Sequence, residues 1–315
     1  MNIKNKIPVI LDTDIGGDID DTWALGMMLK SPELDVKLVV SDTGDTEYRA
    51  KICAKMLEMT GRSEIPVAVG IPMESDGPRE RQRKWVEGYA LEKYPGEVFR
   101  DGVEKIIDVV NNSESPVTLI CIGPAPNIAE LLRREPEIAR KMNFVGMFGS
   151  IRKQHFGKAG AVAEFNVVRD IPACQAIFTA PWKSVKITPL DTCGVVQLKG
   201  ELFLKVSQSE DIAAKIIMDN YKIWLNAQNG SEMPAESSIL YDTVAVHLAY
   251  SEKFLRMAKM GIRVTDDGFT VIDSNSPEIS VAMDWLDLDA YHKYFVERLL
   301  SKNIHLGSPV MTSAL

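Results

Sequence analysis

The sequence predicts an α/β protein with a mostly parallel central sheet and helices on both of its faces. Through the first two thirds of the 315 residues, short and strongly apolar runs alternate with amphipathic segments. Such runs are typical of strands that are buried on both faces, as in parallel sheets covered by helices. No linker, repeat or low-complexity segment divides the chain, so we expect a single domain over residues 1–315. In sheets of this class the functional site lies at the carboxyl ends of the strands.

The elements follow in a regular order along the chain. The apolar runs predict strands at residues 8–11, 36–41, 66–69, 117–122, 143–148 and 184–188. Helical spacing of apolar residues predicts helices at 21–29, 47–59, 83–92, 102–111, 125–133 and 171–179. In the last third of the chain this alternation ends, and the sequence predicts helices at residues 210–228, 240–251 and 288–300. An Asp-Gly pair at 267–268 predicts a hairpin between residues 262–264 and 269–272.

Composition narrows the classes of function. The hydrophobic share of 45% supports a large core. A net charge of −8, from 36 basic and 44 acidic residues, disfavours a nucleic-acid partner. Four scattered cysteines without a Cys-x-x-Cys pair indicate reduced thiols. The first strand starts too early for a signal peptide, and no apolar run is long enough to span a membrane. We therefore expect a cytoplasmic protein without a membrane partner.

Five aspartates fall within residues 12–21, directly after the first predicted strand. Carboxylates packed this closely repel one another, so they need a cation, a shared proton or full solvation. Capping of the next helix would explain one of Asp20 and Asp21, although it leaves the others unexplained. Hard divalent cations prefer oxygen ligands, carboxylates above all. An EF-hand loop is excluded, because Gly16 and Trp23 would occupy its fifth and twelfth positions. The cluster predicts a site for a hard metal and a polyol or phosphate.

Four motifs occur in a specific order over most of the chain. The first is Asp12-Thr-Asp14, a glycine turn and then Asp20-Asp21. The second, at residues 117–129, is a strand with a Gly-Pro turn and Asn-Ile-Ala. The third is Glu-Phe-Asn at 164–166, and the fourth is the segment 240–246 around its aspartate. Together they resemble the motifs of the inosine-uridine preferring nucleoside hydrolases. Each motif alone is a weak signal, whereas four in order are specific.

The resemblance implies a hydrolase that cleaves the N-glycosidic bond of a ribonucleoside, or of a related N-riboside, to ribose and free base. Members of the family hold one Ca²⁺, which binds the ribose diol and the attacking water. By resemblance, Asp14 would ligate this ion and act as general base. Asp21, Asp242 and the backbone carbonyl of Ile122 would be further ligands.

The resemblance also assigns the contacts around the metal. Asp20, Glu164 and Asn166 would bind the sugar, and Asp12 would support the ligands from behind. The partner would be a small nucleoside or riboside, and the chain would assemble as a homodimer or homotetramer.

Several positions depart from the family pattern. Asp45 stands where many members have an asparagine after the second strand, and Lys158 where an asparagine is expected before Glu164. Tyr241 stands where a histidine commonly protonates the leaving base. These positions contact the far end of the sugar and the base, so they leave the accepted base open. Asp18 belongs to a two-residue extension of the first motif, and we expect it to be exposed.

Other side chains are further candidates for substrate contact, each with a plainer alternative. Lys158 would pair with Glu164 or with an anionic group on the sugar. His155 lies in a loop before the third motif, where a lone histidine is usually solvated. Trp85 would stack on a base, although its helical spacing favours a place in the core. Tyr241 would be a weak acid, because the ordinary pKa of tyrosine is about 10. A role in packing explains a tyrosine at this position equally well.

Two other classes of function compete with the hydrolase. Asp12-Thr-Asp14 also matches the Asp-x-Asp motif that supplies the nucleophile of some phosphatases. This hypothesis leaves the third and fourth motifs unexplained. A non-catalytic, metal-dependent binder of ribose or nucleosides would keep the cluster and lack a leaving-group acid. The tyrosine at 241 and the lysine at 158 are its support.

Overall fold

The computed structural model describes residues 6–73, 79–230 and 232–302. The prediction that no signal peptide precedes the first strand concerns the first residues of the chain. All of these except Lys6 lie outside the described residues. No helix in these ranges is both long and apolar enough to cross a membrane.

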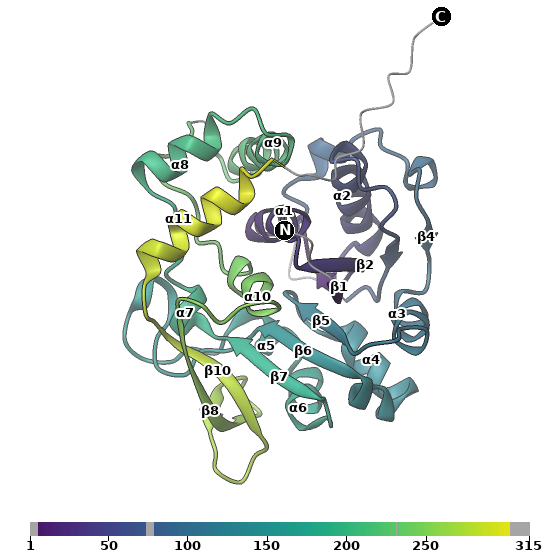
Figure 1. Cartoon of the computed structure of the whole chain (residues 1–315), viewed down its shortest axis with the longest axis vertical. Helices are drawn as coiled ribbons and strands as arrows, with labels where there is room; N and C mark the ends of the chain where they lie inside the picture. The colour runs from purple at the N-terminus through teal and green to yellow at the C-terminus, as the bar shows by residue number, and fades with distance from the viewer. Residues whose placement is uncertain (1–5, 74–78, 231, 303–315) are drawn as a thin grey trace, which may run out of the picture.

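One ten-stranded sheet organises the molecule (Figure 1). Its strand order is β4-β3-β2-β1-β5-β6-β7-β10-β8-β9. All neighbours from β4 to β10 pair in parallel, whereas β8 runs antiparallel to both β10 and β9. The predicted α/β class with a mostly parallel sheet is confirmed. The strands are β1 Ile7–Thr13, β2 Leu34–Ser41, β3 Val67–Val69, β4 Val98–Phe99, β5 Val117–Cys121, β6 Met142–Met147, β7 Ser184–Thr188, β8 Leu255–Val264, β9 Thr270–Ile272 and β10 Glu278–Trp285.

Helices cover both faces of the sheet. The α-helices are α1 Asp20–Leu29, α2 Thr46–Met59, α3 Gly102–Asn111, α4 Pro126–Arg134, α5 Phe165–Arg169, α6 Ile171–Thr179, α7 Leu190–Cys193, α8 Gly200–Ser207, α9 Ile212–Ala227, α10 Thr243–Leu248 and α11 Leu288–Leu299. The short 3-10 turns of the described ranges are η1 Arg83–Val86, η2 Leu91–Lys93, η3 Pro136–Lys141 and η4 His155–Gly157. Helices α3, α4 and α6 lie along one face, and α1 and α10 along the other, with α8, α9 and α11 beyond them (Figure 1).

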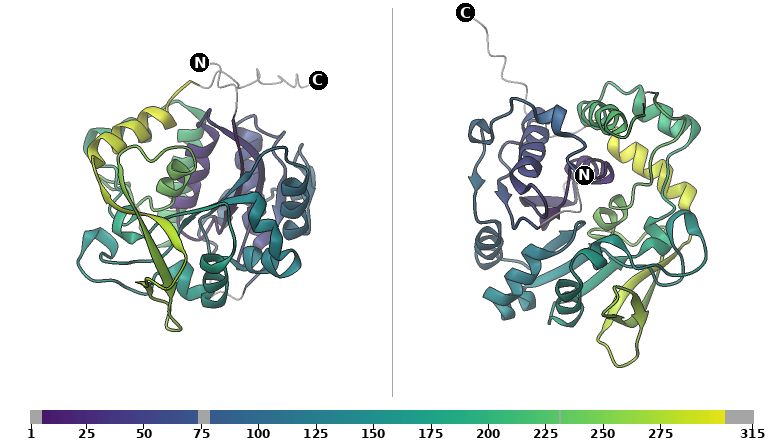
Figure 2. Two further views of the ribbon diagram at one scale, coloured as in Figure 1. Left: turned by 60° about the horizontal axis from the view of Figure 1, so that its bottom comes forward. Right: turned by 180° about the vertical axis from the view of Figure 1, so that it is seen from behind.

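The central strand shows why both faces are covered. Successive side chains of a strand point to opposite faces. Val9 and Leu11 of β1 therefore belong to the core beneath α1 and α2, whereas Ile10 belongs to the core beneath α3 and α4. All three are fully buried. Two further views show that β8 and β10 form one end of the sheet, away from β1 and β2 (Figure 2).

The structure corrects three predictions about the elements. Residues 83–92 form no α-helix but the turns η1 and η2, because Gly88 between them has a left-handed φ of +74°. The helix predicted at 240–251 shortens to α10. The hairpin around Gly268 is confirmed, but β8 is much longer than predicted because it also pairs with β10, a strand that was not predicted.

Candidate active site at the strand ends

A cavity of about 250 Å³ lies at the carboxyl ends of β1, β5 and β6. It is the place where a ligand site is expected in an open α/β sheet. Segments from the whole length of the chain meet there. Its walls are Asp14, Gly17, Asp18, Asp20, Asp21, Arg79, Ile122, Met147, His155, Glu164, Phe165, Asn166, Leu190, Tyr241 and Asp242.

The connection from β1 to α1 supplies most of the acids. Strand β1 ends at Thr13, so Asp14 follows the strand. Asp20 and Asp21 form the first turn of α1, where the helix dipole favours negative charge. Neither of them caps the helix, since Ile19 holds the N-cap position without a side-chain hydrogen bond. The Thr13 hydroxyl instead donates to Asp21 Oδ1 over 2.5 Å and orients this carboxylate.

Asp242 joins this pair from the N-terminus of α10. One carboxylate oxygen from each of Asp20, Asp21 and Asp242 lies within 4.8 Å of the others, and all three residues are buried. Burial, followed by repulsion from neighbouring carboxylates, raises the pKa of each well above its ordinary value. Arg49 opposes this shift at Asp21, but none of the three carboxylates forms an ion pair with a described residue.

Asp14 has a cationic neighbour that the sequence did not single out. Arg49 of α2 is buried, and its Nη2 lies 3.9 Å from Asp14 Oδ2. Arg49 also donates to the backbone carbonyls of Thr43 (2.8 Å) and Ile15 (2.9 Å). Burial nevertheless raises the pKa of Asp14, with Arg49 opposing the shift.

Asp12 lies behind the cavity and contacts none of its open space. Its carboxylate accepts from Asn127 Nδ2 over 2.7 Å. Burial raises the pKa of Asp12 to about 6. The neighbouring Asp42 is buried, and neither of its oxygens meets a donor among the described residues. Burial and the charge of Asp12 raise the pKa of Asp42 well above its ordinary value.

The Glu-Phe-Asn motif ties β5 and β6 to the cavity wall. Glu164 caps α5 and accepts from the backbone N–H groups of Gly149, Asn166 and Val167. Burial outweighs these bonds and raises the pKa of Glu164 to about 7. Asn166 Nδ2 donates to the carbonyl of Ile122 over 3.1 Å. That carbonyl keeps a second lone pair for another partner.

His155 and Tyr241 line the cavity together. Nδ1 of His155 lies 2.8 Å from the Tyr241 hydroxyl, and the two rings meet edge to face. Burial raises the pKa of Tyr241 and lowers that of His155. The sequence proposed each residue separately but gave no sign that they form a pair.

Arg79 and Phe165 form a second pair on the cavity wall, and the sequence analysis did not predict this pair. The Arg79 guanidinium lies 4.5 Å from the centre of the Phe165 ring. Arg79 belongs to the connection between β3 and η1, far from every motif, so only the fold reveals its place.

Three predicted contact residues lie outside the cavity. Asp45 caps α2 through Tyr48 N and pairs with Arg83 over 2.9 Å. Trp85 packs into the core beneath Lys55, as its alternative predicted. Lys158 is exposed, lies outside the cavity wall and makes no ion pair with Glu164, whose carboxylate accepts from backbone N–H groups. Asp18 is exposed as expected, yet it stands on the cavity wall.

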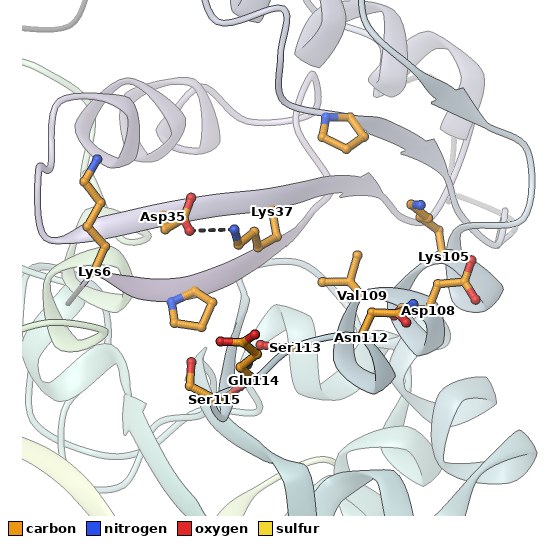
Figure 3. A pocket seen from close by; sticks show the side chains of 12 residues that line it. Lys6, Asp35, Lys37, Lys105, Asp108, Val109, Asn112, Ser113, Glu114 and Ser115 are labelled. Atoms are coloured by element: carbon orange, nitrogen blue, oxygen red, sulfur yellow. Dashed lines mark hydrogen bonds and ion pairs between the residues drawn. The ribbon is translucent and has the colours of Figure 1, made fainter.

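A second hollow, of about 560 Å³, lies at the opposite edge of the sheet (Figure 3). Residues at the amino ends of β1, β2 and β3 form it together with the end of α3. Its charged side chains are of both signs, and Lys37 pairs with Asp35 over 2.6 Å. This hollow brings together none of the residues of the four motifs.

The acids of the cavity fit a hard divalent cation. The donors that meet there are carboxylate and carbonyl oxygens, the ligand type that such ions prefer. The raised pKa values of Asp20, Asp21 and Asp242 show that an added positive charge would be favourable at this place.

Comparison with known proteins decides the family. The family model described as inosine-uridine preferring nucleoside hydrolase matches residues 9–293. This chain belongs to that family. A pyrimidine-specific ribonucleoside hydrolase, RihA, of Citrobacter koseri is 26% identical over 314 residues, which cover 93% of this chain and 98% of the relative. RihA of an Enterobacter species is 33% identical over 183 residues, or 55% of this chain and 56% of that one.

Solved structures of nucleoside hydrolases share the fold. The plant nucleoside hydrolase PpNRh1 aligns with a TM-score of 0.79 at 21% identity, covering 95% of this chain and all of the other. A purine-preferring ribonucleoside hydrolase from Gardnerella vaginalis gives 0.74 at 20% identity, covering 93% and 98%. The family makes the chain an N-glycosyl hydrolase of ribonucleosides, which sets the phosphatase alternative aside.

Proposed function

We propose that this nucleoside hydrolase uses Asp14 as general base beside a Ca²⁺ ion, with Asp14, Asp21, Asp242 and the carbonyl of Ile122 as its ligands. The observation that carries the proposal is that Asp14 and Ile122 line one cavity with Asp20, Asp21 and Asp242, whose oxygens approach one another to within 4.8 Å. Asp242 is far from the other two in the sequence, and none of the three forms an ion pair with a described residue. When bound, the ion supplies positive charge that holds the ribose diol and lowers the pKa of a water molecule.

Asp14 would take the proton of the attacking water. A catalytic base works best when its pKa lies nearer to the working pH than that of an exposed carboxylate. Burial raises the pKa of Asp14 toward the working pH, and the charge of Arg49 lowers it in part. Asp12 supports the end of β1 through its hydrogen bond from Asn127.

The remaining acids act on the sugar. Cleavage of an N-glycosidic bond develops positive charge on the ribose, and carboxylates around the ring stabilise this oxocarbenium-like transition state. Asp20 would accept a hydrogen bond from a ribose hydroxyl, and Glu164 and Asn166 would bind the sugar beside it. His155 and Tyr241 form the wall next to Asp242, where they would contact the substrate.

The wider setting of the proposal follows the family resemblance. The substrate would be a ribonucleoside or a related riboside, with no nucleic-acid or membrane partner. The chain would act as one domain and assemble into a homodimer or homotetramer. The protein would act in the cytoplasm and would take part in the salvage of purine or pyrimidine bases.

Free ribose released from a panel of ribonucleosides tests the proposal. Asp14→Asn should lower kcat by about 10²–10⁴-fold, the usual contribution of a general base. Asp219→Asn, an exposed aspartate on α9, is the matched control and should leave kcat unchanged. Undiminished turnover in Asp14→Asn would overturn the role of Asp14. Tight binding of nucleosides by the wild-type protein, without ribose release, would instead favour a non-catalytic binder.

A further inference from the structure

Arg79 is the one Lys or Arg among the described residues that line the cavity. Its side chain makes no hydrogen bond or ion pair with any described residue, and its contact is the ring of Phe165. A contact with the face of an aromatic ring uses none of the N–H groups of a guanidinium. Arg79 therefore presents unused donors and a permanent positive charge to the cavity.

Neutralisation of the acids is the simpler role for such a cation. Arg79 does lower the pKa of Asp14 and Asp18, but each effect is smaller than that of burial. The neighbouring arginines that serve acids do so in direct pairs: Arg49 with Asp14 at 3.9 Å and Arg83 with Asp45 at 2.9 Å. Arg79 approaches no carboxylate of the described residues in this way, so its geometry favours a ligand from outside the chain.

A cation on the wall of the cavity would stabilise a leaving base that carries negative charge. A base that leaves without a proton carries the electron pair of the broken bond. Among the described residues that line the cavity, Nδ1 of His155 and the hydroxyl of Tyr241 engage each other at 2.8 Å. The carboxylate of Glu164 accepts from three backbone N–H groups, so none of these three side chains is free to donate to the base. Fixed positive charge at the point where negative charge develops stabilises such a transition state.

We propose that Arg79, held over the ring of Phe165, binds the departing base and stabilises the negative charge that develops on it. This inference rests on the proposed function. The electron pair of the C1′–N bond passes to the base nitrogen. The oxygen of a water molecule forms the new bond to C1′, and the water's proton passes to Asp14. The base then takes a proton from solvent. A 5′-phosphate fits Arg79 less well, because six carboxylates share this small cavity with it.

Substrates that differ in their leaving group test the proposal. Arg79→Gln should lower kcat for uridine and inosine by about 10²-fold. The same variant should change kcat for p-nitrophenyl riboside by less than about threefold, because p-nitrophenolate is a stable anion. Phe165→Leu should give the same pattern with a smaller loss. Arg81→Gln, two residues away and outside the cavity wall, is the control and should match the wild type.

Three results would overturn the role of Arg79: an equal loss with both kinds of substrate, no loss at all, or a loss confined to 5′-phosphorylated nucleosides. An equal loss would show a structural role, and thermal unfolding of Arg79→Gln would reveal it independently. Failure of the proposed function has a different signature, because the wild-type protein would then release ribose from neither uridine nor p-nitrophenyl riboside.

Discussion

At the scale of single residues, burial controls the acids of this site. Asp12 and Glu164 have pKa values raised to about 6 and about 7, from 3.8 and 4.5, because both carboxyl groups lie out of solvent. A carboxyl group with a raised pKa binds more protons in the folded than in the unfolded state between these values. The free energy of unfolding then falls as the pH rises through the interval.

We therefore expect the metal-free protein to lose stability between about pH 4.5 and pH 7. Urea unfolding in the presence of chelator, followed over this range, measures the effect. Glu164→Gln should flatten the profile because it removes one of the groups, whereas the exposed Glu87→Gln should leave the slope intact. Stability that rises over the same interval would show that these groups are not protonated in the folded state.

Sequence motifs predicted the acids of the site much better than its cations. Asp14, Asp20, Asp21 and Asp242 stand in motifs with fixed spacing, and all four meet at the cavity. Arg49 and Arg79 lie in ordinary charged segments, and only the folding of α2 and of the segment before η1 brings them to the acids. Asp45 was misplaced because a cap and an ion pair with Arg83 satisfy its side chain locally.

At the scale of elements, Arg49 joins α2 to the connections that follow β1 and β2. Arg49→Met should destabilise the protein by about 3 kcal/mol, since it leaves two buried carbonyls and Asp14 without their partner. It should also lower activity through the position of Asp14. Lys51→Met on the same helix removes a half-exposed i,i+4 pair with Glu47 and should cost less than about 1 kcal/mol. Similar urea midpoints for both variants would contradict this role of Arg49.

The turn after β5 depends on a residue without a side chain. A Cβ on Gly123 would lie 2.6 Å from Asp42 Oδ2 and 2.9 Å from both Cβ and the backbone nitrogen of Asp14. We expect Gly123→Ala to push Asp14 out of place and to reduce kcat at least about tenfold, since small misplacements of catalytic groups are costly. Gly230→Ala, where the nearest atom is 3.2 Å away, is the control. Full activity in Gly123→Ala would show that the turn can shift without consequence.

Element prediction succeeded where apolar runs are buried and failed where local conformation decides. Strands β1, β5 and β6 consist of buried residues throughout or nearly so, and their runs stand out in the sequence. The segment 83–92 has helical spacing, but Gly88 with positive φ divides it. Strand β10 has exposed and half-buried positions at both ends, so its pairing with β7 and β8 was not visible.

At the scale of the whole molecule, the parallel sheet explains how one site collects residues from the entire chain. The carboxyl ends of β1, β5 and β6 meet at one edge, where Asp14, Ile122 and the Glu-Phe-Asn motif line the same cavity. Helix α10 packs against α1, which brings Asp242 to Asp20 and Asp21. The sequence predicted this class of sheet, and with it the edge at which the site lies. The fit of α10 against α1 depends on tertiary packing that no local pattern encodes.

The measurement that tests the central claim most directly is ribose release from nucleosides before chelation, after chelation and after the return of Ca²⁺. Asp242→Asn serves as the variant that weakens the metal site. We predict that chelation abolishes release, that Ca²⁺ restores it in the wild-type protein, and that Asp242→Asn needs far more Ca²⁺ for the same rate. Release that continues unchanged after complete removal of divalent ions would contradict a hydrolase built around a metal held by Asp21 and Asp242.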